Sequence, residues 1–138
     1  MSERSDIERI VMERIVEHLE LVGYTVSRER EDFYIAKHPH RYNISLLCYR
    51  IGFLIRAIFG KKEGARQEWA ADFVNRLNQK AFVARFYVDE DGDLNVEAFW
   101  PYFYDRTTFG TFLDVWERDL DRMVEIYREF IGSRVSSE

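Results

Sequence analysis

The fold class of this chain is decided by WAADFVNRLNQKAFVARFYVDEDGDLNVEA, residues 69–98. Apolar residues recur at helical spacing as far as Leu77, and two runs of alternating apolar residues follow. This pattern predicts a helix over about 65–77, with Asn78 as the left-handed residue that ends it. It then predicts one strand at 82–88 and another at 94–100, joined by an acidic turn.

The apolar faces of these two strands determine how they pair. When Val88 lies opposite Leu94, the apolar side chains share one face and the loop between the strands has three residues. Such a loop favours a left-handed glycine at its third position, which is Gly92 here. The same register predicts an ion pair between Arg85 and Glu97 on the outer face of the hairpin. An even-length loop would mispair the two faces.

The rest of the sequence predicts two further helices and four further strands. The first helix covers 6–22, with Ser5 and Glu8 as a capping box at its start and Gly23 after its end. The last helix covers 108–131 and leaves a frayed tail, 132–138. Four strands lie between the first two helices, and their connections are too short for parallel crossovers: 24–28, 33–37, 43–49 and 53–59.

These elements predict an α+β fold in a single domain, 1–138. Its twisted antiparallel sheet has the element order helix–strands–helix–two strands–helix. On the first helix, His18 is expected at a boundary or on the surface. The buried face of that helix is predicted from one apolar stripe: Ile7, Ile10, Val11, Ile15, Leu19 and Val22.

Composition and charge exclude several classes of protein. The chain has 138 residues, 46% of them hydrophobic and 33% charged, which is typical of a soluble globular domain. Its net charge of -5 argues against sequence-independent nucleic-acid binding, which needs a positive face. No apolar run is long enough for a membrane span or a signal core, so we expect a cytoplasmic protein without a membrane partner. Cys48 is the single cysteine and is expected in the core.

Two groups of residues suggest metal ligands. Residues 89–93 carry four carboxylates in five positions, but a calcium loop needs its glycine at position six and Glu at position twelve, which is Trp100 here. His38 and His40 lack the further ligands of a structural zinc site. Both segments are therefore interpreted as turns, and the chain is predicted to hold no metal and no cofactor.

The sequence also predicts no catalytic residues. It contains no nucleophile elbow, no phosphate-binding glycine pattern and no dinucleotide fingerprint. We therefore expect a protein that is not an enzyme.

A run of aromatic residues offers the best candidate for a binding surface. Five of the six residues at 99–104 are aromatic, and a domain of this size can pack only part of them inward. Either they seal the sheet edge and the base of the last helix, or some of them contact a partner. Trp69 and Phe73 are the candidates for a dimer contact. The predicted partner-binding residues are Phe99, Trp100, Tyr102, Phe103 and Tyr104.

Several short segments carry a family resemblance: Gly23-Tyr24, Asn75-Arg76-Leu77-Asn78, ARFYVD at 84–89, Asp91-Gly92-Asp93, Val96-Glu97 and Thr108. With them the chain resembles the YbjN-like family, bacterial proteins described as sensory transduction regulators with a fold similar to type III secretion chaperones. The resemblance implies a non-enzymatic, chaperone-like or regulatory module that binds a protein or peptide, often as a homodimer. The chain departs from the family at 100–104, where the family has a milder polar segment. The alternative is a small-molecule or metal-binding sensor domain.

Overall fold

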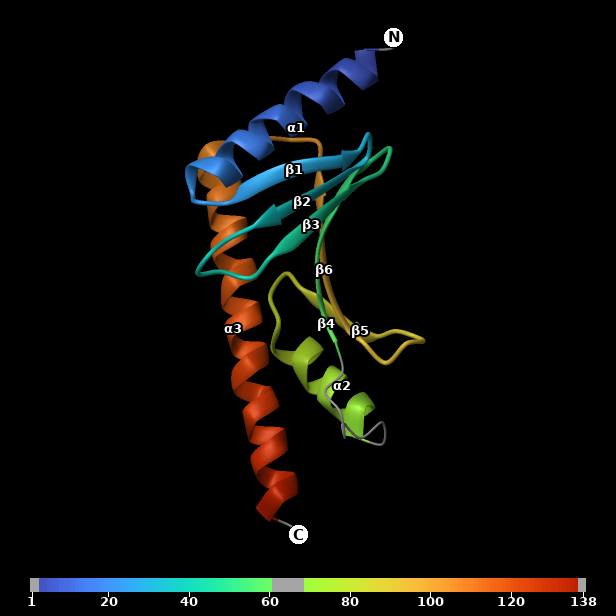
Figure 1. Ribbon diagram of the computed structural model, residues 1–138, viewed down its shortest axis with the longest axis vertical. Helices are drawn as coiled ribbons and strands as arrows, with labels where there is room; N and C mark the ends of the chain where they lie inside the picture. The colour runs from blue at the N-terminus through green and yellow to red at the C-terminus, as the bar shows by residue number, and fades with distance from the viewer. Residues whose placement is uncertain (1–2, 61–68, 137–138) are drawn as a thin grey trace. The chain divides into compact units, whose positions relative to one another are not determined.

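The computed structural model describes residues 3–60 and 69–136, which form helices and the strands of one antiparallel sheet (Figure 1). The sheet has six strands in the order β1-β2-β3-β4-β6-β5. The α+β class and the element order are therefore confirmed. None of the described helices is long and apolar enough to cross a bilayer. The elements are α1(Glu3–Leu21), β1(Thr25–Arg30), β2(Phe33–Lys37), β3(Ile44–Cys48), β4(Gly52–Phe59), α2(Ala70–Lys80), β5(Arg85–Val88), β6(Leu94–Pro101) and α3(Arg106–Ser136).

The chain divides into two compact units, which we describe one at a time. The first unit comprises Met1–Ala57 and Glu97–Thr111, and the second comprises Ile58–Val96 and Phe112–Glu138. The boundary passes through β4, β6 and α3, so neither unit is a continuous stretch of sequence. That both units form one domain stays a prediction.

In the first unit, three antiparallel ladders join β1 to β4. Leu46 of β3 lies opposite Tyr34 of β2 and Ile55 of β4, which fixes the register across three strands. Leu46 and Ile55 are fully buried, as are Ile15 and Leu19 of α1. Burying apolar side chains of this size contributes about 1.5–3 kcal/mol each, so these residues form the core of the first unit.

Helix α1 differs from its prediction at the start. It begins at Glu3, so Ser5 lies inside the helix and the predicted capping box is wrong. Ile7 and Ile10 are 54% and 49% exposed, so the first two residues of the predicted stripe do not face the core. His18, expected at a boundary or on the surface, is buried. The end of the helix is as predicted, because Gly23 has a φ of 105°.

In the second unit, α2 continues beyond its predicted end. It runs to Lys80, and no non-glycine residue among those described has a positive φ. The prediction that Asn78 is a left-handed terminal residue is therefore wrong. The predicted start of this helix at 65 falls within 61–68, outside the described residues. Trp69 precedes the helix and stacks on Phe130 of α3 at a centroid distance of 5.6 Å.

Strand β5 begins at Arg85 rather than at the predicted position 82 because a buried carboxylate captures the preceding backbone. Asp119 of α3 is 3% exposed and accepts hydrogen bonds from three consecutive amides, at 2.8–3.0 Å. The donors are the N–H groups of Phe82, Val83 and Ala84. These amides bond to a side chain instead of a neighbouring strand, so the segment leaves the sheet.

The turn between β5 and β6 has the predicted form. The Asp89 amide donates to the Asp93 carbonyl at 3.0 Å, and Gly92 has a φ of 86°. This bond places Asp89 opposite Asp93. In the predicted register, where Val88 lies opposite Leu94, these two residues form the next pair, so the turn agrees with that register. Glu97 belongs to the first unit and is 1% exposed, so its predicted place on a solvent-facing surface is wrong. Its ion pair with Arg85 stays a prediction.

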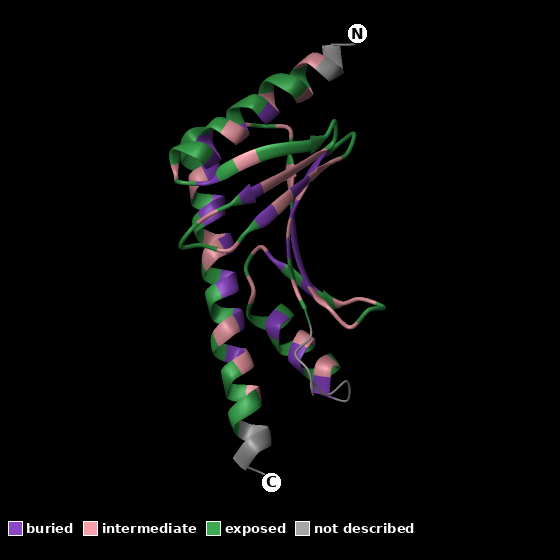
Figure 2. Ribbon diagram, viewed as in Figure 1, coloured by how far each residue is buried: buried purple, intermediate pink, exposed green. Residues whose placement is uncertain are grey.

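Helix α3 is longer than predicted at both ends. It spans Arg106–Ser136, so most of the predicted frayed tail is helical. The buried positions recur along one side of the helix (Figure 2), as the apolar spacing of the sequence predicts. Its first turn is capped by Asp105, whose carboxylate accepts from the Thr108 amide at 2.9 Å and from the Thr108 hydroxyl at 2.8 Å.

Replacing Asp105 by Ala is expected to lower the urea midpoint of unfolding at pH 7. The hydrogen bonds from Thr108 hold the pKa of the Asp105 carboxyl below its usual value. The stabilisation is therefore present above the unfolded pKa, about 3.9, and is lost as the pH falls through the lower folded pKa. Urea titrations of both proteins at pH 7 and pH 3 test this. Equal midpoints at pH 7, or a gap that widens in acid, would contradict the capping role.

Candidate protein-binding surface

The aromatic run at 99–104 lies in the first unit, at the end of β6 and in the link to α3. Phe99 and Phe103 are 47% and 51% exposed. Trp100, Tyr102 and Tyr104 are intermediate in exposure. Phe99 and Phe103 are therefore the most exposed rings of the run, and contact of the run with a partner stays a prediction.

The three less exposed rings are held by specific contacts. The Trp100 indole Nε1 donates to the Phe103 carbonyl at 2.9 Å, and its ring packs edge-on against Phe109. The Tyr104 hydroxyl lies 2.8 Å from the His18 Nδ1, which explains why His18 is buried. The Tyr102 hydroxyl donates to the Tyr49 carbonyl. These contacts fix the backbone from which Phe99 and Phe103 project.

Two more exposed apolar residues lie beside this run, in the turn between β3 and β4. Tyr49 is 48% exposed and Ile51 is 69% exposed. Tyr49 is linked to the run by the Tyr102 hydrogen bond. Gly52 follows at the start of β4, where a Cβ would clash with the backbone carbonyl oxygen of Trp100 and would also meet the Phe99 ring, so only glycine permits this approach. We call Tyr49, Ile51, Phe99 and Phe103 the apolar patch.

Sequence reasoning missed half of this patch. The sequence predicts only that residues 50–52 connect the strands at 43–49 and 53–59, and nothing in one sequence places this connection beside the end of β6. The sequence did offer one indication of these residues: Tyr49 and Ile51 are apolar residues at a connection between strands, where polar turn residues are more common.

Two titratable groups close to the patch, the Cys48 thiol and the Tyr102 phenol, are neutral at physiological pH. Burial raises the pKa of the Cys48 thiol, an effect partly offset by a hydrogen bond with Tyr102. Burial also raises the pKa of Tyr102 well above its ordinary value. Because the thiolate is the nucleophilic form of cysteine, a raised pKa makes Cys48 less reactive. The sequence predicts Cys48 in the core. In the structure its exposure is intermediate, so it is only partly buried.

The predicted dimer contacts lie in the second unit and pack within the chain. Trp69 and Phe73 are 8% and 6% exposed. Both rings contact Tyr127 and Phe130 of α3, at centroid distances of 5.4–6.1 Å. In this conformation they offer little surface to a second copy. The dimer contact through them stays a prediction.

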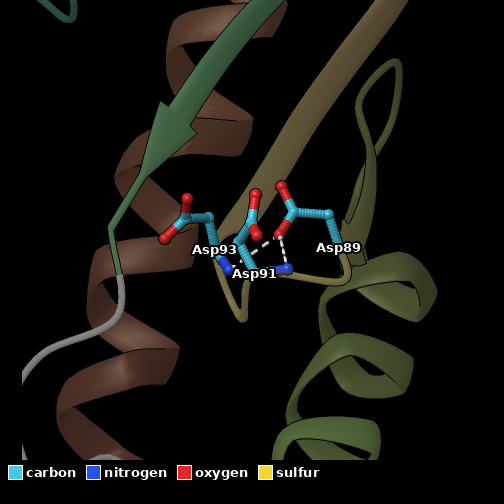
Figure 3. A group of neighbouring side chains, drawn as sticks. All are labelled: Asp89, Asp91 and Asp93. Atoms are coloured by element: carbon cyan, nitrogen blue, oxygen red, sulfur yellow. Dashed lines mark hydrogen bonds between the residues drawn. The ribbon is translucent and has the colours of Figure 1, made fainter.

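The acidic turn brings three carboxylates together (Figure 3). One ligand atom from each of Asp89, Asp91 and Asp93 lies within 4.8 Å of the others. The Asp89 carboxylate accepts from the amides of Asp91 and Asp93 at 2.9 and 3.0 Å, and from the Asn95 side chain at 2.7 Å. These bonds lower the pKa of Asp89 and account for its position as a turn residue. A metal-sensing role for the turn stays a hypothesis.

His38 uses both ring nitrogens within the chain. Its Nδ1 accepts from the amides of His40 and Arg41 at 3.0 and 3.1 Å, and its Nε2 lies 3.1 Å from the Val22 carbonyl. With Nδ1 as acceptor, Nε2 carries the proton and donates to Val22. This arrangement supports the interpretation of 38–41 as a turn tied to the end of α1.

A comparison with solved structures finds this fold in YbjN from E. coli, a protein provisionally described as a transcription regulator. The match has a TM-score of 0.65 and covers 88% of this chain and 93% of that chain, at 14% sequence identity. At this identity the likeness concerns the fold alone, and it confirms the predicted YbjN-like fold. No protein-family model matches the chain, and no curated protein matches its sequence.

Proposed function

We propose that this chain is a non-enzymatic module that binds a protein or peptide through the apolar patch. The observation that carries the proposal is that two segments far apart in the sequence lie next to each other, and each exposes two apolar residues: Tyr49 and Ile51 in one, Phe99 and Phe103 in the other. Exposed aromatic residues that lie together are characteristic of interaction surfaces, because they bury much area at low entropic cost.

Three features support binding rather than catalysis. The backbone of the patch is held by the contacts of Trp100, Tyr102 and Gly52, so a partner would meet a preformed surface. The nearby Cys48 thiol and Tyr102 phenol have raised pKa values and are poor nucleophiles. The fold is shared with a protein whose description is regulatory.

The double substitution F99S/F103S is expected to weaken peptide binding at least tenfold. Each replacement removes a large apolar contact, and two interface aromatic residues together contribute several kcal/mol. A random peptide library displayed on phage identifies ligands of the unmodified protein, and fluorescence polarisation then measures their Kd for each variant. Circular dichroism checks that F99S/F103S remains folded.

Phe82 provides the matched control for this experiment. It is 76% exposed but lies in the second unit, outside the patch. F82S should leave the Kd unchanged. If F82S and F99S/F103S weaken binding equally, or if neither does, the apolar patch is not the binding surface.

A further inference from the structure

The outer edge of β5 is covered by a side chain where another strand would pair. The Asn78 carboxamide of α2 makes two hydrogen bonds to the backbone of Phe86: its Oδ1 accepts from the Phe86 amide at 2.9 Å, and its Nδ2 donates to the Phe86 carbonyl at 3.0 Å. One donor and one acceptor are what a neighbouring strand would offer to such a residue. The carboxamide therefore replaces a peptide group of a neighbouring strand.

The hydrogen bonding of the turn after β5 shows that the backbone amide and carbonyl of Phe86 point to this outer edge. The Asp89 amide bonds to the Asp93 carbonyl, on the side of β6 and one residue before it, and backbone groups alternate in direction along a strand. Even-numbered residues of β5 therefore point away from β6. The preceding even-numbered residue, Ala84, donates its amide to Asp119 at 2.9 Å. Two successive outward positions are thus bonded to side chains of α2 and α3.

The strand at the opposite edge of the sheet has a different protection. β1 carries the charged run Arg28-Glu29-Arg30 and an irregularity in its register between Arg28 and Arg30. Charges and bulges are common devices that keep exposed edge strands from pairing. β5 reads RFYV and has one charge, Arg85, so its sequence alone protects it poorly.

We propose that Asn78 caps the β5 edge and prevents a second copy of this chain from pairing there. The excluded dimer has its twofold axis at Phe86, because the outward amide and carbonyl of Phe86 can bond to those of Phe86 in the second copy. In that register Arg85 lies opposite Tyr87 of the second copy, a favourable cation–π pair. Arg85 is the one charge of β5, and in this register it does not face its counterpart in the second copy.

The N78A variant tests this proposal, with N75A as its matched control. Asn75 is an exposed residue one turn earlier on α2, and the structure shows no side-chain hydrogen bond for it. Alanine has a higher helix propensity than asparagine, so neither change weakens the helix itself. Sedimentation equilibrium is expected to show dimerisation at least tenfold tighter for N78A than for N75A.

Two more variants decide the outcome. N78A/Y87K should dimerise as weakly as N75A, because a lysine at position 87 would face Arg85 of the second copy and the two positive charges would repel each other. N78D keeps an acceptor for the Phe86 amide but loses the donor, and should dimerise to an intermediate extent; it serves if N78A does not fold. The cap is refuted if folded N78A, or folded N78D in its place, associates no more tightly than N75A. The Phe86-centred register is refuted if N78A/Y87K dimerises as tightly as N78A.

Discussion

The Asp119→Ala variant is expected to lose about 4 kcal/mol of unfolding free energy, because the carboxylate bonds to three consecutive amides. A hydrogen bond to a charged group is worth roughly 1.5–3 kcal/mol, and water can solvate part of the freed backbone. Asp119 is also 3% exposed, so the alanine leaves buried donors without an acceptor. Urea denaturation followed by circular dichroism measures the loss.

Asp114 provides the control for this prediction. It lies on the same helix, is exposed, and has no side-chain hydrogen bond or ion pair in the structure. D114A should change the unfolding free energy by less than about 0.5 kcal/mol, as surface substitutions usually do. The unfolding free energy of D119N should lie between those of D119A and D114A. The asparagine oxygen can still accept hydrogen bonds, but its NH₂ group would face backbone donors. Equal stabilities of D119A and D114A would show that Asp119 does not hold this segment.

The second large effect is expected for Arg56, which pairs with the buried Glu97 in the first unit. The Glu97 side chain is 2% exposed and that of Arg56 is 27% exposed. The Arg56 Nε donates to Glu97 Oε2 at 2.8 Å, and its Nη2 bonds to the same oxygen. Removing one partner of a buried pair costs about 3–5 kcal/mol, because a charge stays in a poorly solvating site. R56M is therefore expected to lose about 3 kcal/mol, measured by urea denaturation.

A double variant distinguishes the pair from simple loss of packing. R56M/E97M replaces both charges by apolar groups of similar length, and is expected to be more stable than R56M alone. Arg122 gives the surface comparison, because its pair with Glu125 leaves both side chains about half exposed, at 48% and 58%. R122A should lose less than about 1 kcal/mol. If R56M and R122A lose the same unfolding free energy, the buried pair stabilises the fold no more than the surface pair does.

Much of the fold was predictable because local spacing carries it. The alternation in residues 94–100 predicts β6, and the spacing on 108–131 predicts most of α3. Gly92 was predictable because a three-residue loop requires a left-handed residue at that position. Gly23 was predictable for the same conformational reason. Each of these inferences depends on residues close together in the chain.

The errors arose where distant residues compete for backbone groups. Asn78 was expected to end α2, but its carboxamide bonds to Phe86 and the helix continues to Lys80. The segment before Arg85 was expected to be strand, but Asp119 takes its amides from 35 to 37 residues away. Glu97 was expected at the surface, but it pairs with Arg56, 41 residues earlier. No local pattern records such contacts.

The candidate binding surface divides in the same way. The sequence by itself determined the α+β class, the order of the elements and the aromatic run at 99–104, because periodicity and composition depend only on neighbouring residues. Only the tertiary structure decided which of those rings are exposed, and only it brought Tyr49 and Ile51 beside them. The physical reason is that exposure depends on which segments pack together, and the pairing of β-strands joins residues far apart in the chain.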